Sequence, residues 1–296
     1  MTDTESKKPK LAFIGLGVMG YPMAGHLARA KYDVTVYNRT RAKADQWVKD
    51  HGGRAVATPR EAAHGADIVF SCVGNDHDLR AVALGAEGAF AGMQKGAVYA
   101  DHSTVSANVA RELEQIARGA GFDFLDAPVS GGQAGAEKGI LTVMVGGVPH
   151  AFATAEPVMA HYGRAVTLMG PAGAGQLTKM VNQITIVGLV QSLAEGLNFA
   201  TRVGLDAKKV IDVISKGAAQ SWQLENRGPT MVDDKFDFGF AVDWMRKDLQ
   251  ICLDEGRRSG ALLPVTAVVE QWYGKLQEKG YGRLDSSSLM KLLTEK

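Results

Sequence analysis

Gly15, Gly17 and Gly20 form a G-x-G-x-x-G motif directly after a short apolar run, residues 11–14. In such a motif the first glycine permits a tight turn, the second lets the backbone approach a pyrophosphate, and the third allows a helix to pack closely on the strand. A helix that begins there directs its unpaired N–H groups at phosphate. The motif therefore predicts a dinucleotide-binding βαβ unit whose loop residues also contact the cofactor, namely Leu16, Val18 and Met19.

Short β-rich runs alternate with helical stretches from Leu11 to about Gly170. Several of the runs are apolar at odd and even positions alike, which is typical of parallel strands covered by helices on both faces. We therefore predict an α/β chain in which residues 11–170 form a Rossmann-type, doubly wound, mostly parallel sheet. The runs are LAFIGLG, DVTVYN, DIVFSCV, AVYADHS, DFLDAPV, LTVMVGG and AVTLMG.

The alternation ends at Pro171, and residues 174–202 follow without a proline and rich in Ala, Leu, Val and Gln. This stretch predicts one long helix, roughly 45 Å in length at ~1.5 Å per residue. We expect it to begin an all-helical domain, residues 171–296, for substrate binding and dimerisation. Further helices are predicted over residues 207–216, 242–259, 264–280 and 286–293.

The composition argues against several classes of function. With 33 basic and 32 acidic side chains the net charge is +1, so no overall field attracts nucleic acid or a membrane surface. No stretch reaches about 18 uninterrupted apolar residues, and residues 1–10 read as a disordered tail. Cys72 and Cys252 are far apart in apolar settings, as expected of reduced thiols in a cytoplasmic protein. The histidines show no zinc-type spacing, so we predict no metal site.

The end of the second predicted strand indicates which cofactor is used. An acidic residue there would accept hydrogen bonds from the ribose hydroxyls of NAD, but the chain has Asn38, Arg39 and Thr40, followed by Arg41. A neutral amide, a planar cation and a hydroxyl suit a 2′-phosphate instead. We expect NADP(H) rather than NAD(H), with Val73 as a further cofactor contact.

Three segments rich in glycine and small polar residues follow predicted strands, where ligands of open α/β sheets bind. Ser130, Gly131 and Gly132 offer a hydroxyl and accessible backbone amides to a carboxylate. Lys179 lies near the start of the long helix, where the helix dipole disfavours a cation. The segments are Asp101 to Thr104, Asp126 to Gly132, and Gly173 to Lys179.

With these motifs in order, nearly the whole chain resembles the β-hydroxyacid dehydrogenases, which include 3-hydroxyisobutyrate dehydrogenase, tartronate semialdehyde reductase and glyoxylate/succinic semialdehyde reductase. The matching segments are FIGLGVMGYPMAGHL, DHST, DAPVSGG, GAGQLTKMVNQ and Lys247-Asp248-Leu249. The resemblance implies that Lys179 is the acid/base residue and that Ser130, Gly131 and Gly132 bind substrate. It also implies that Thr104 and Lys247 approach cofactor and substrate.

Asn182 lies three residues after Lys179, on the same helical face, where it can orient a substrate hydroxyl. Several relatives have a second asparagine at the next position, but this chain has Gln183. Which of the two amides meets the substrate is left open by the sequence. His102, beside Asp101, is the rival acid/base group because histidine titrates near neutrality.

The predicted activity is hydride transfer between NADP(H) and a small carboxylate-bearing substrate, a β-hydroxy acid or its semialdehyde or keto acid, with proton transfer by Lys179. Two alternatives are an imine reductase-like enzyme and a catalytically silent NADP-binding module. The apolar stretch ITIVGLVQSLAEGLNF in the long helix also predicts a homodimer or homotetramer.

Overall fold

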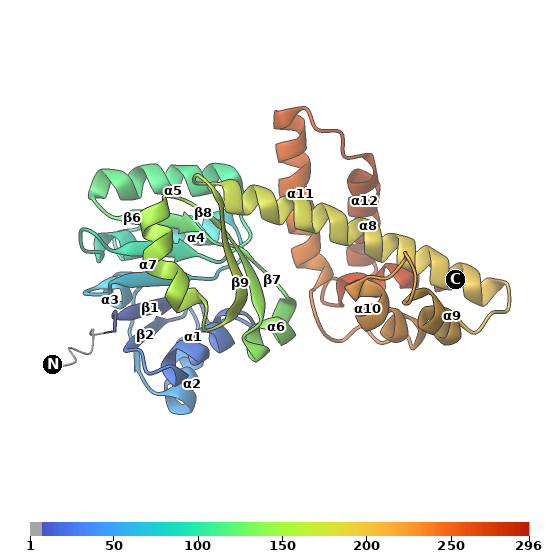
Figure 1. Ribbon diagram of the computed structural model, residues 1–296, viewed down its shortest axis with the longest axis horizontal. Coiled ribbons are helices and arrows are strands. Elements are labelled where there is room, and N and C mark those ends of the chain that lie inside the picture. Colours follow the sequence, from blue (N-terminus) through green and yellow to red (C-terminus); the bar gives the residue numbers. More distant parts are fainter. Residues whose placement is uncertain (1–7, 296) are drawn as a thin grey trace. The chain divides into compact units, whose positions relative to one another are not determined.

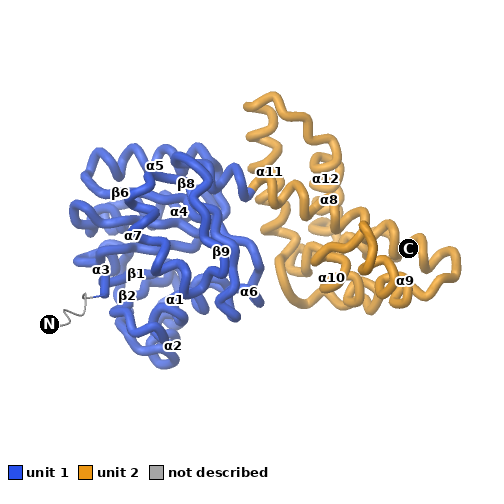
Figure 2. Tube along the Cα trace, in the orientation of Figure 1, with its two compact units in different colours: residues 1–179 blue, residues 180–296 orange. Residues whose placement is uncertain are grey.

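The computed structural model describes residues 8–295. Contacts divide the chain into two compact units, residues 1–179 and 180–296 (Figure 2). The division lies inside the long helix and later than the predicted boundary at Gly170, so Lys179 belongs to the first unit.

Unit 1 is built on a sheet of nine strands within the described residues, in the order β3-β2-β1-β4-β5-β6-β8-β7, with β9 paired to β8 (Figure 1). All neighbouring pairs from β3 to β6 are parallel, as is the pair β8–β9. The strands are β1 Leu11–Ile14, β2 Val34–Tyr37, β3 Arg54–Ala55, β4 Ile68–Ser71, β5 Val98–Asp101, β6 Asp123–Asp126, β7 Val129–Ser130, β8 Leu141–Gly146 and β9 Gly163–Gly170.

Helices cover both faces of this sheet. Leu11 and Phe13 of β1 belong to one core, with α1, α2, α6 and α7, and Ala12 and Ile14 belong to another, with α3, α4 and α5. Burial on both faces explains why the strands lack a polar–apolar alternation. The helices of this unit are α1 Gly20–Arg29, α2 Arg41–His51, α3 Pro59–Ala63, α4 Asp76–Leu84, the 3₁₀ turn η1 Ala89–Ala91, α5 Ala107–Ala120, α6 Gly132–Lys138 and α7 Pro149–Met159.

The short strand β7 continues β6 after a break at Ala127 and Pro128. Both strands pair antiparallel with β8 in one register, Asp126 opposite Gly146 and Ser130 opposite Thr142. The amide of Met144 donates to the carbonyl of Pro128 across the break. Only the pairs that β8 forms with β6 and β7 are antiparallel, so the sheet is mostly parallel, as predicted. Strand β7 carries the backbone past the carboxyl end of β6 to Ser130.

Unit 2 is helical and packs around the second part of α8, which runs over Ala174–Arg202 as predicted. Val187, Val190 and Leu197 of α8 are buried against the other helices of the unit. These are α9 Ala207–Ile214, α10 Trp222–Val232, α11 Val242–Ser259, α12 Pro264–Glu278, the 3₁₀ turn η2 Ser286–Met290 and α13 Lys291–Thr294. The predicted fold class is therefore confirmed.

Three local predictions differ from the structure. The helix predicted over residues 286–293 is instead the 3₁₀ turn η2 followed by the short helix α13. Helix α10 was not expected, because Gly228 and Pro229 interrupt its pattern. Its start is nevertheless capped by Ser221, whose hydroxyl accepts from the amide of Leu224 at 3.1 Å. The tail predicted over residues 1–10 lies outside the described residues up to residue 7. Lys10 is held in place, because its amide donates to Asp67 Oδ2 at 2.8 Å directly before β1 begins.

Within residues 8–295, α8 is the helix long and apolar enough to cross a membrane by length and composition alone. Only 33% of its most apolar window is buried. Val181, Leu189 and Phe199 are exposed apolar residues on this helix. A core helix of a globular protein passes the same test, so the feature does not by itself indicate a membrane.

Gly175 is expected to be essential for seating the start of α8. A Cβ there would lie 2.4 Å from the carbonyl oxygen of Met144 and 2.6 Å from that of Asp126, both rigid backbone atoms. Gly175→Ala should therefore destabilise the protein by at least about 2 kcal/mol, measured by denaturant unfolding. Gly196→Ala is the control, because a Cβ at Gly196 in the same helix meets nothing within 4 Å. Equal stability of the two variants would contradict this account.

Candidate active site

The glycine loop has the geometry that a dinucleotide requires. Gly15 has a φ of +93°, and a Cβ there would lie 2.3 Å from the carbonyl oxygen of Cys72, so only glycine fits. A Cβ at Gly20 would lie 1.9 Å from the Gly15 carbonyl oxygen, whereas one at Gly17 would meet nothing within 4 Å. Gly17 thus faces open space, as expected where a pyrophosphate approaches the backbone. The residues present fit a bound dinucleotide.

The end of β2 is tied directly to this loop. Asn38 Oδ1 accepts a hydrogen bond from the amide of Leu16 at 2.9 Å, and its Nδ2 donates to the carbonyl of Thr40 at 3.0 Å. Asn38 therefore holds the loop as well as occupying the position after β2. Arg39 is almost fully exposed, 88% for its side chain, and its guanidinium lies 3.6 Å from Asp78 Oδ1. Val18, by contrast with the buried Leu16, is 63% exposed on the loop.

A buried carboxylate organises the ends of β4 and β5. Asp101 Oδ1 accepts from the hydroxyls of Ser71 at 2.6 Å and Ser103 at 2.7 Å. Ser103 Oγ in turn accepts from the amide of Val73 at 2.8 Å. This chain of hydrogen bonds fixes the loop that carries Val73, next to the glycine loop, and the loop that leads to Thr104.

The start of α8 is held by Asp126 at the end of β6. Its Oδ1 accepts from the amide of Gly173 at 2.7 Å and its Oδ2 from that of Gln176 at 2.8 Å, which satisfies two N–H groups at the helix start. Burial raises the pKa of Asp126 to about 6, against the opposing effect of these hydrogen bonds. Gln176 also donates to the carbonyl of Ser103 and accepts from the amide of Val105. Helix α8 is thereby joined to the ends of β5 and β6.

Lys179 follows on the second turn of α8 and is 8% exposed. It lies in unit 1 together with four residues that were predicted to bind substrate. Thr104 and Ser130 are half-buried, and Gly131 and Gly132 are exposed where β7 passes into α6. Both glycines have positive φ, +133° and +60°, and a Cβ at Gly132 would meet nothing within 4 Å. Unit 1 therefore contains the glycine loop, the Ser130–Gly132 turn and a buried lysine.

The remaining predicted residues belong to unit 2. Asn182 Nδ2 donates to Gln183 Oε1 at 2.8 Å, and Gln183 Nε2 donates to Asp248 Oδ2 at 2.6 Å. The other oxygen of Asp248 lies 2.8 Å from Lys247 Nζ. Gln183 and Asp248 are almost fully buried, at 3% and 1% exposure, and Asn182 is half-buried. The oxygen and the NH₂ group of Gln183 therefore both form hydrogen bonds with side chains of unit 2.

His102 is a core residue. Its Nδ1 lies 2.7 Å from the carbonyl oxygen of Ala127 and its Nε2 lies 2.8 Å from the hydroxyl of Tyr162. The ring stacks on Phe70 with centroids 5.6 Å apart. A neutral ring satisfies both contacts, with Nδ1–H donating and Nε2 accepting. Burial lowers the pKa of His102 to about 4, which does not suit a proton donor at neutral pH.

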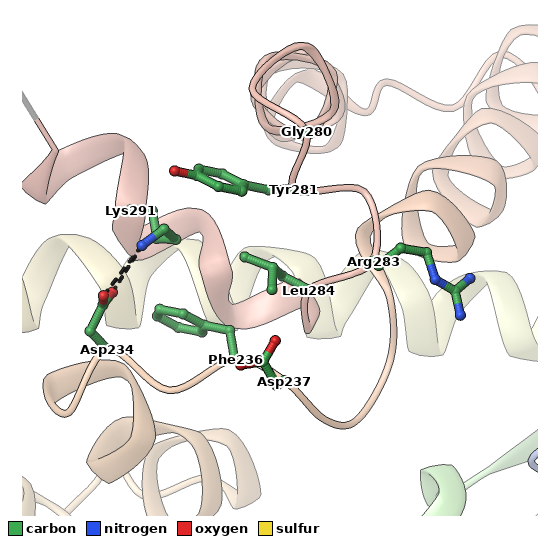
Figure 3. A pocket seen from close by; sticks show the side chains of 8 residues that line it. All are labelled: Asp234, Phe236, Asp237, Gly280, Tyr281, Arg283, Leu284 and Lys291. Carbon is green, nitrogen blue, oxygen red and sulfur yellow. Dashed lines mark hydrogen bonds and ion pairs between the residues drawn. The ribbon is translucent and has the colours of Figure 1, made fainter.

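Unit 2 has a cavity of about 220 Å³ outside the predicted site (Figure 3). Lys291 lies on its wall, but its Nζ is paired with Asp234 at 3.2 Å and Glu295 at 2.8 Å. The other residues that line the cavity are Asp234, Phe236, Asp237, Gly280, Tyr281, Arg283 and Leu284. Across residues 8–295, no group of three or more His, Cys, Asp or Glu side chains is placed to hold a metal ion.

Comparison with known proteins agrees with this geometry. Residues 10–170 match the NAD binding domain of 6-phosphogluconate dehydrogenase, and residues 173–293 match a family described as NAD-binding of NADP-dependent 3-hydroxyisobutyrate dehydrogenase. An Arabidopsis thaliana protein named probable 3-hydroxyisobutyrate dehydrogenase-like 1, mitochondrial, is 40% identical over 95% of this chain and 84% of its own length. The chain belongs to the β-hydroxyacid dehydrogenase family.

Two further comparisons cover nearly the whole length of both proteins. An uncharacterized oxidoreductase of Shewanella frigidimarina is 62% identical over 95% of this chain and 97% of its own length. The structure of Mycobacterium tuberculosis 3-hydroxyisobutyrate dehydrogenase with L-serine is 29% identical, with a TM-score of 0.88 over 97% of this chain and all of the other. The chain is thus an oxidoreductase of this family with an NAD(P)-binding domain.

Three buried side chains that hold candidate site segments of this chain were present in the motifs, but the sequence analysis gave them no role. Asp126 stands in DAPVSGG, Gln176 in GAGQLTKMVNQ and Asp248 beside Lys247. Each makes its contacts with residues far away in the chain. The sequence did offer one signal, which is an acidic or amide side chain in a segment expected to be buried. Such a side chain is rarely buried without a hydrogen-bond partner, so it predicts that a partner exists.

The buried state of His102 predicts a specific pH dependence. Below about pH 6.5 the unfolded chain protonates this histidine, whereas the folded chain does not until about pH 4. The wild type should therefore lose about 3 kcal/mol of stability relative to His102→Gln as the pH falls from 6.5 to 4. Denaturant unfolding of both proteins across this range measures the difference. Parallel pH profiles, or loss of turnover in folded His102→Gln, would contradict the core assignment.

Proposed function

We propose that the chain is an NADP(H)-dependent enzyme that interconverts a small β-hydroxy acid and its semialdehyde or keto acid, with Lys179 as the general acid and base. The observation that carries this proposal is the burial of Lys179, at 8% exposure. A lysine that serves only solubility is exposed to solvent, and lysines are almost never buried. Lys179 is buried, and it also lies near a helix start, where the helix dipole disfavours its positive charge. A cation kept at such a position is a candidate for proton transfer.

Reduction of the carbonyl compound adds a hydride to carbon and a proton to oxygen. When bound, the reduced nicotinamide supplies the hydride. The Lys179 ammonium donates the proton to the developing alkoxide and is left as the neutral amine. In the oxidation direction, the amine accepts the hydroxyl proton. The Asp126 and Gln176 contacts hold the helix turn from which Lys179 extends.

Carboxylate binding is assigned to the turn Ser130–Gly132. The Ser130 hydroxyl and the backbone amides of Gly131 and Gly132 offer donors without a competing side chain, and Gly132 faces open space. Thr104 is assigned to the same substrate and to the cofactor. A β-hydroxy acid is favoured because relatives bear the name 3-hydroxyisobutyrate dehydrogenase.

NADP(H) is favoured by the charge at the end of β2. A 2′-phosphate there would find the exposed guanidinium of Arg39 and the hydroxyl of Thr40, with Arg41 nearby in the chain. Asp78, 3.6 Å from Arg39, already orients the guanidinium but leaves it largely in solvent. The neutral amide of Asn38 adds no repulsion toward phosphate, whereas a carboxylate would.

We also propose that the chain forms a homo-oligomer and acts in the cytoplasm. The exposed apolar side chains of α8, among them Val181 and Phe199, are better covered by a second copy than by water. No nucleic-acid or membrane partner is proposed, since the net charge is near zero.

Lys179→Ala should lower kcat for NADPH-dependent reduction of small semialdehydes by about 10³-fold, since general acid–base catalysis contributes roughly 10²–10⁴. The dissociation constant for NADPH, measured by fluorescence titration, should change less than about threefold. The folded state of the variant is checked by circular dichroism. Undiminished turnover of Lys179→Ala would refute the proposal. Wild-type activity with cyclic imines alone would indicate an imine reductase, and cofactor binding without any turnover would indicate a silent module.

Arg39→Asp should change the cofactor preference, because a carboxylate repels the 2′-phosphate and accepts hydrogen bonds from the ribose hydroxyls. The ratio of kcat/KM for NADPH to that for NADH should fall by at least about 30-fold, equivalent to about 2 kcal/mol. Arg118→Asp is the matched control, since Arg118 is 74% exposed at the end of α5 and pairs with Glu114. A ratio that is the same in both variants would exclude Arg39 from phosphate binding.

A further inference from the structure

We infer that Asp78 limits how strongly the protein prefers NADP(H) over NAD(H), so that both cofactors are bound. The inference deepens the proposed function and rests on the part of it in which Arg39 binds the 2′-phosphate. It starts from one ion pair within unit 1, in which Arg39 Nη1 lies 3.6 Å from Asp78 Oδ1. Arg39 follows β2 directly, and Asp78 lies in the first turn of α4.

The start of α4 fixes the place of Asp78. The backbone amide of Asp78 donates to the side-chain oxygen of the capping residue Asn75 at 2.8 Å. The next residue, Leu79, is fully buried in the core of unit 1. Asp76, in the same turn, accepts a hydrogen bond from the amide of Ser106 at 2.9 Å. A carboxylate is favoured at a helix start by the helix dipole, so Asp78 holds a negative charge at a defined point.

The backbone at Arg39 is also held, whereas its side chain extends into solvent. The preceding residue, Asn38, accepts from the amide of Leu16 in the glycine loop and donates to the carbonyl of Thr40. The side chain of Arg39 is 88% exposed, against 27% for the side chain of Asp78. An anion that binds this guanidinium must therefore share it with Asp78 or draw it away from Asp78.

Asp78 opposes the binding of a 2′-phosphate in both cases. If Arg39 keeps its pair with Asp78, a phosphate at the same nitrogen comes within roughly 7 Å of the carboxylate, because a charge-assisted hydrogen bond adds about 3 Å. This separation is shorter than the Debye length of about 8 Å at physiological ionic strength, so the two anions repel each other. If Arg39 turns toward the phosphate instead, its ion pair with Asp78 is lost.

The same carboxylate does not oppose NAD(H), whose ribose carries a neutral hydroxyl in place of the phosphate. A carboxylate accepts hydrogen bonds from hydroxyls and does not repel them. The end of β2 lacks the acidic residue of NAD-binding sites. Asp78 brings a negative charge to that point from α4 instead. The site thus combines a cation that favours the 2′-phosphate with an acid that moderates its effect.

Asp78→Asn is the decisive variant, because it removes the charge and keeps the size of the side chain. Dissociation constants for NADPH and NADH are measured by fluorescence titration at about 10 mM ionic strength, where the Debye length is about 30 Å. The constant for NADPH should fall about fivefold relative to wild type, as expected for removal of one like charge from the neighbourhood of the phosphate. The constant for NADH should change less than about twofold, because NADH has no charge at this position.

Two further variants and a salt titration separate an effect of charge from an effect of structure. Asp78→Glu keeps the charge and should bind NADPH within about twofold of wild type, whereas Asp78→Lys should bind it more tightly than Asp78→Asn does. At 1 M salt the Debye length is about 3 Å, so the difference in NADPH affinity between Asp78→Asn and wild type should fall below about twofold. A change of packing alone would not follow the charge or the salt concentration.

Asp33→Asn is the matched control, because Asp33 also pairs with an exposed arginine of unit 1, Arg54, at 3.3 Å, but directly before β2 rather than after it. It should leave both dissociation constants unchanged. Thermal unfolding is measured for each variant.

Weaker NADPH binding by Asp78→Asn would overturn the inference, because Asp78 would then orient Arg39 for the phosphate. Unchanged NADPH binding in the folded variant, or an equal change for NADPH and NADH, would overturn it as well. Failure of the proposed function is seen separately, for Arg39 as an unchanged cofactor ratio in Arg39→Asp and for Lys179 as full turnover in Lys179→Ala. The titrations themselves require no turnover.

Discussion

The carboxylate of Asp126 is the constraint on which the arrangement of the site depends. It ends β6 and accepts hydrogen bonds from the amides of Gly173 and Gln176, so the sheet and the helix that carries Lys179 share one buried group. Gly175 lets the helix approach to within contact of the β6 and β8 backbones. Because the helix start is fixed to the sheet, a lysine on its second turn has a defined place relative to the ends of the strands.

Buried aspartates that accept hydrogen bonds occur at several other places in the chain. Asp101, Asp126, Asp248 and Asp285 are each at most 1% exposed, and each accepts hydrogen bonds from residues that position a loop or helix. Asp285, for example, accepts from the amide of Phe240 and from Ser287. A buried charge is costly unless its partners are complete, so each of these groups permits few alternative arrangements around it. Rigid placement of the reacting groups, which proton and hydride transfer require, follows from that restriction.

The sequence was sufficient wherever structure follows from local pattern. The glycine spacing after β1, the doubly buried strands and the proline-free stretch of α8 each gave the observed element, and the motifs gave the family. It was insufficient where an element depends on distant partners. Helix α10 was hidden by Gly228 and Pro229, and packing of Leu224 and Met231 into the unit 2 core outweighs those residues.

The candidate site likewise contains residues whose roles follow from the sequence and residues whose roles do not. Lys179 and the turn Ser130–Gly132 follow from motif and position, but the contacts that give Asn38, Gln176 and Gln183 their roles span from 22 to 73 residues in the chain. Hydrogen bonds between side chains so far apart produce no periodic pattern in the sequence. His102 shows the converse, because a histidine beside a motif aspartate is attractive in sequence and proves to be packed between Phe70 and Tyr162.

The central claim, that one buried amine passes the proton, is tested most directly by supplying that amine from solution. In Lys179→Ala, single-turnover oxidation of bound NADPH by a semialdehyde is followed while small primary amines of different basicity are added. The account predicts a rate that rises with amine concentration and varies with amine basicity, with no such rise in the wild type. A rate in the variant that ignores every amine small enough to enter, while NADPH and substrate still bind, would contradict it.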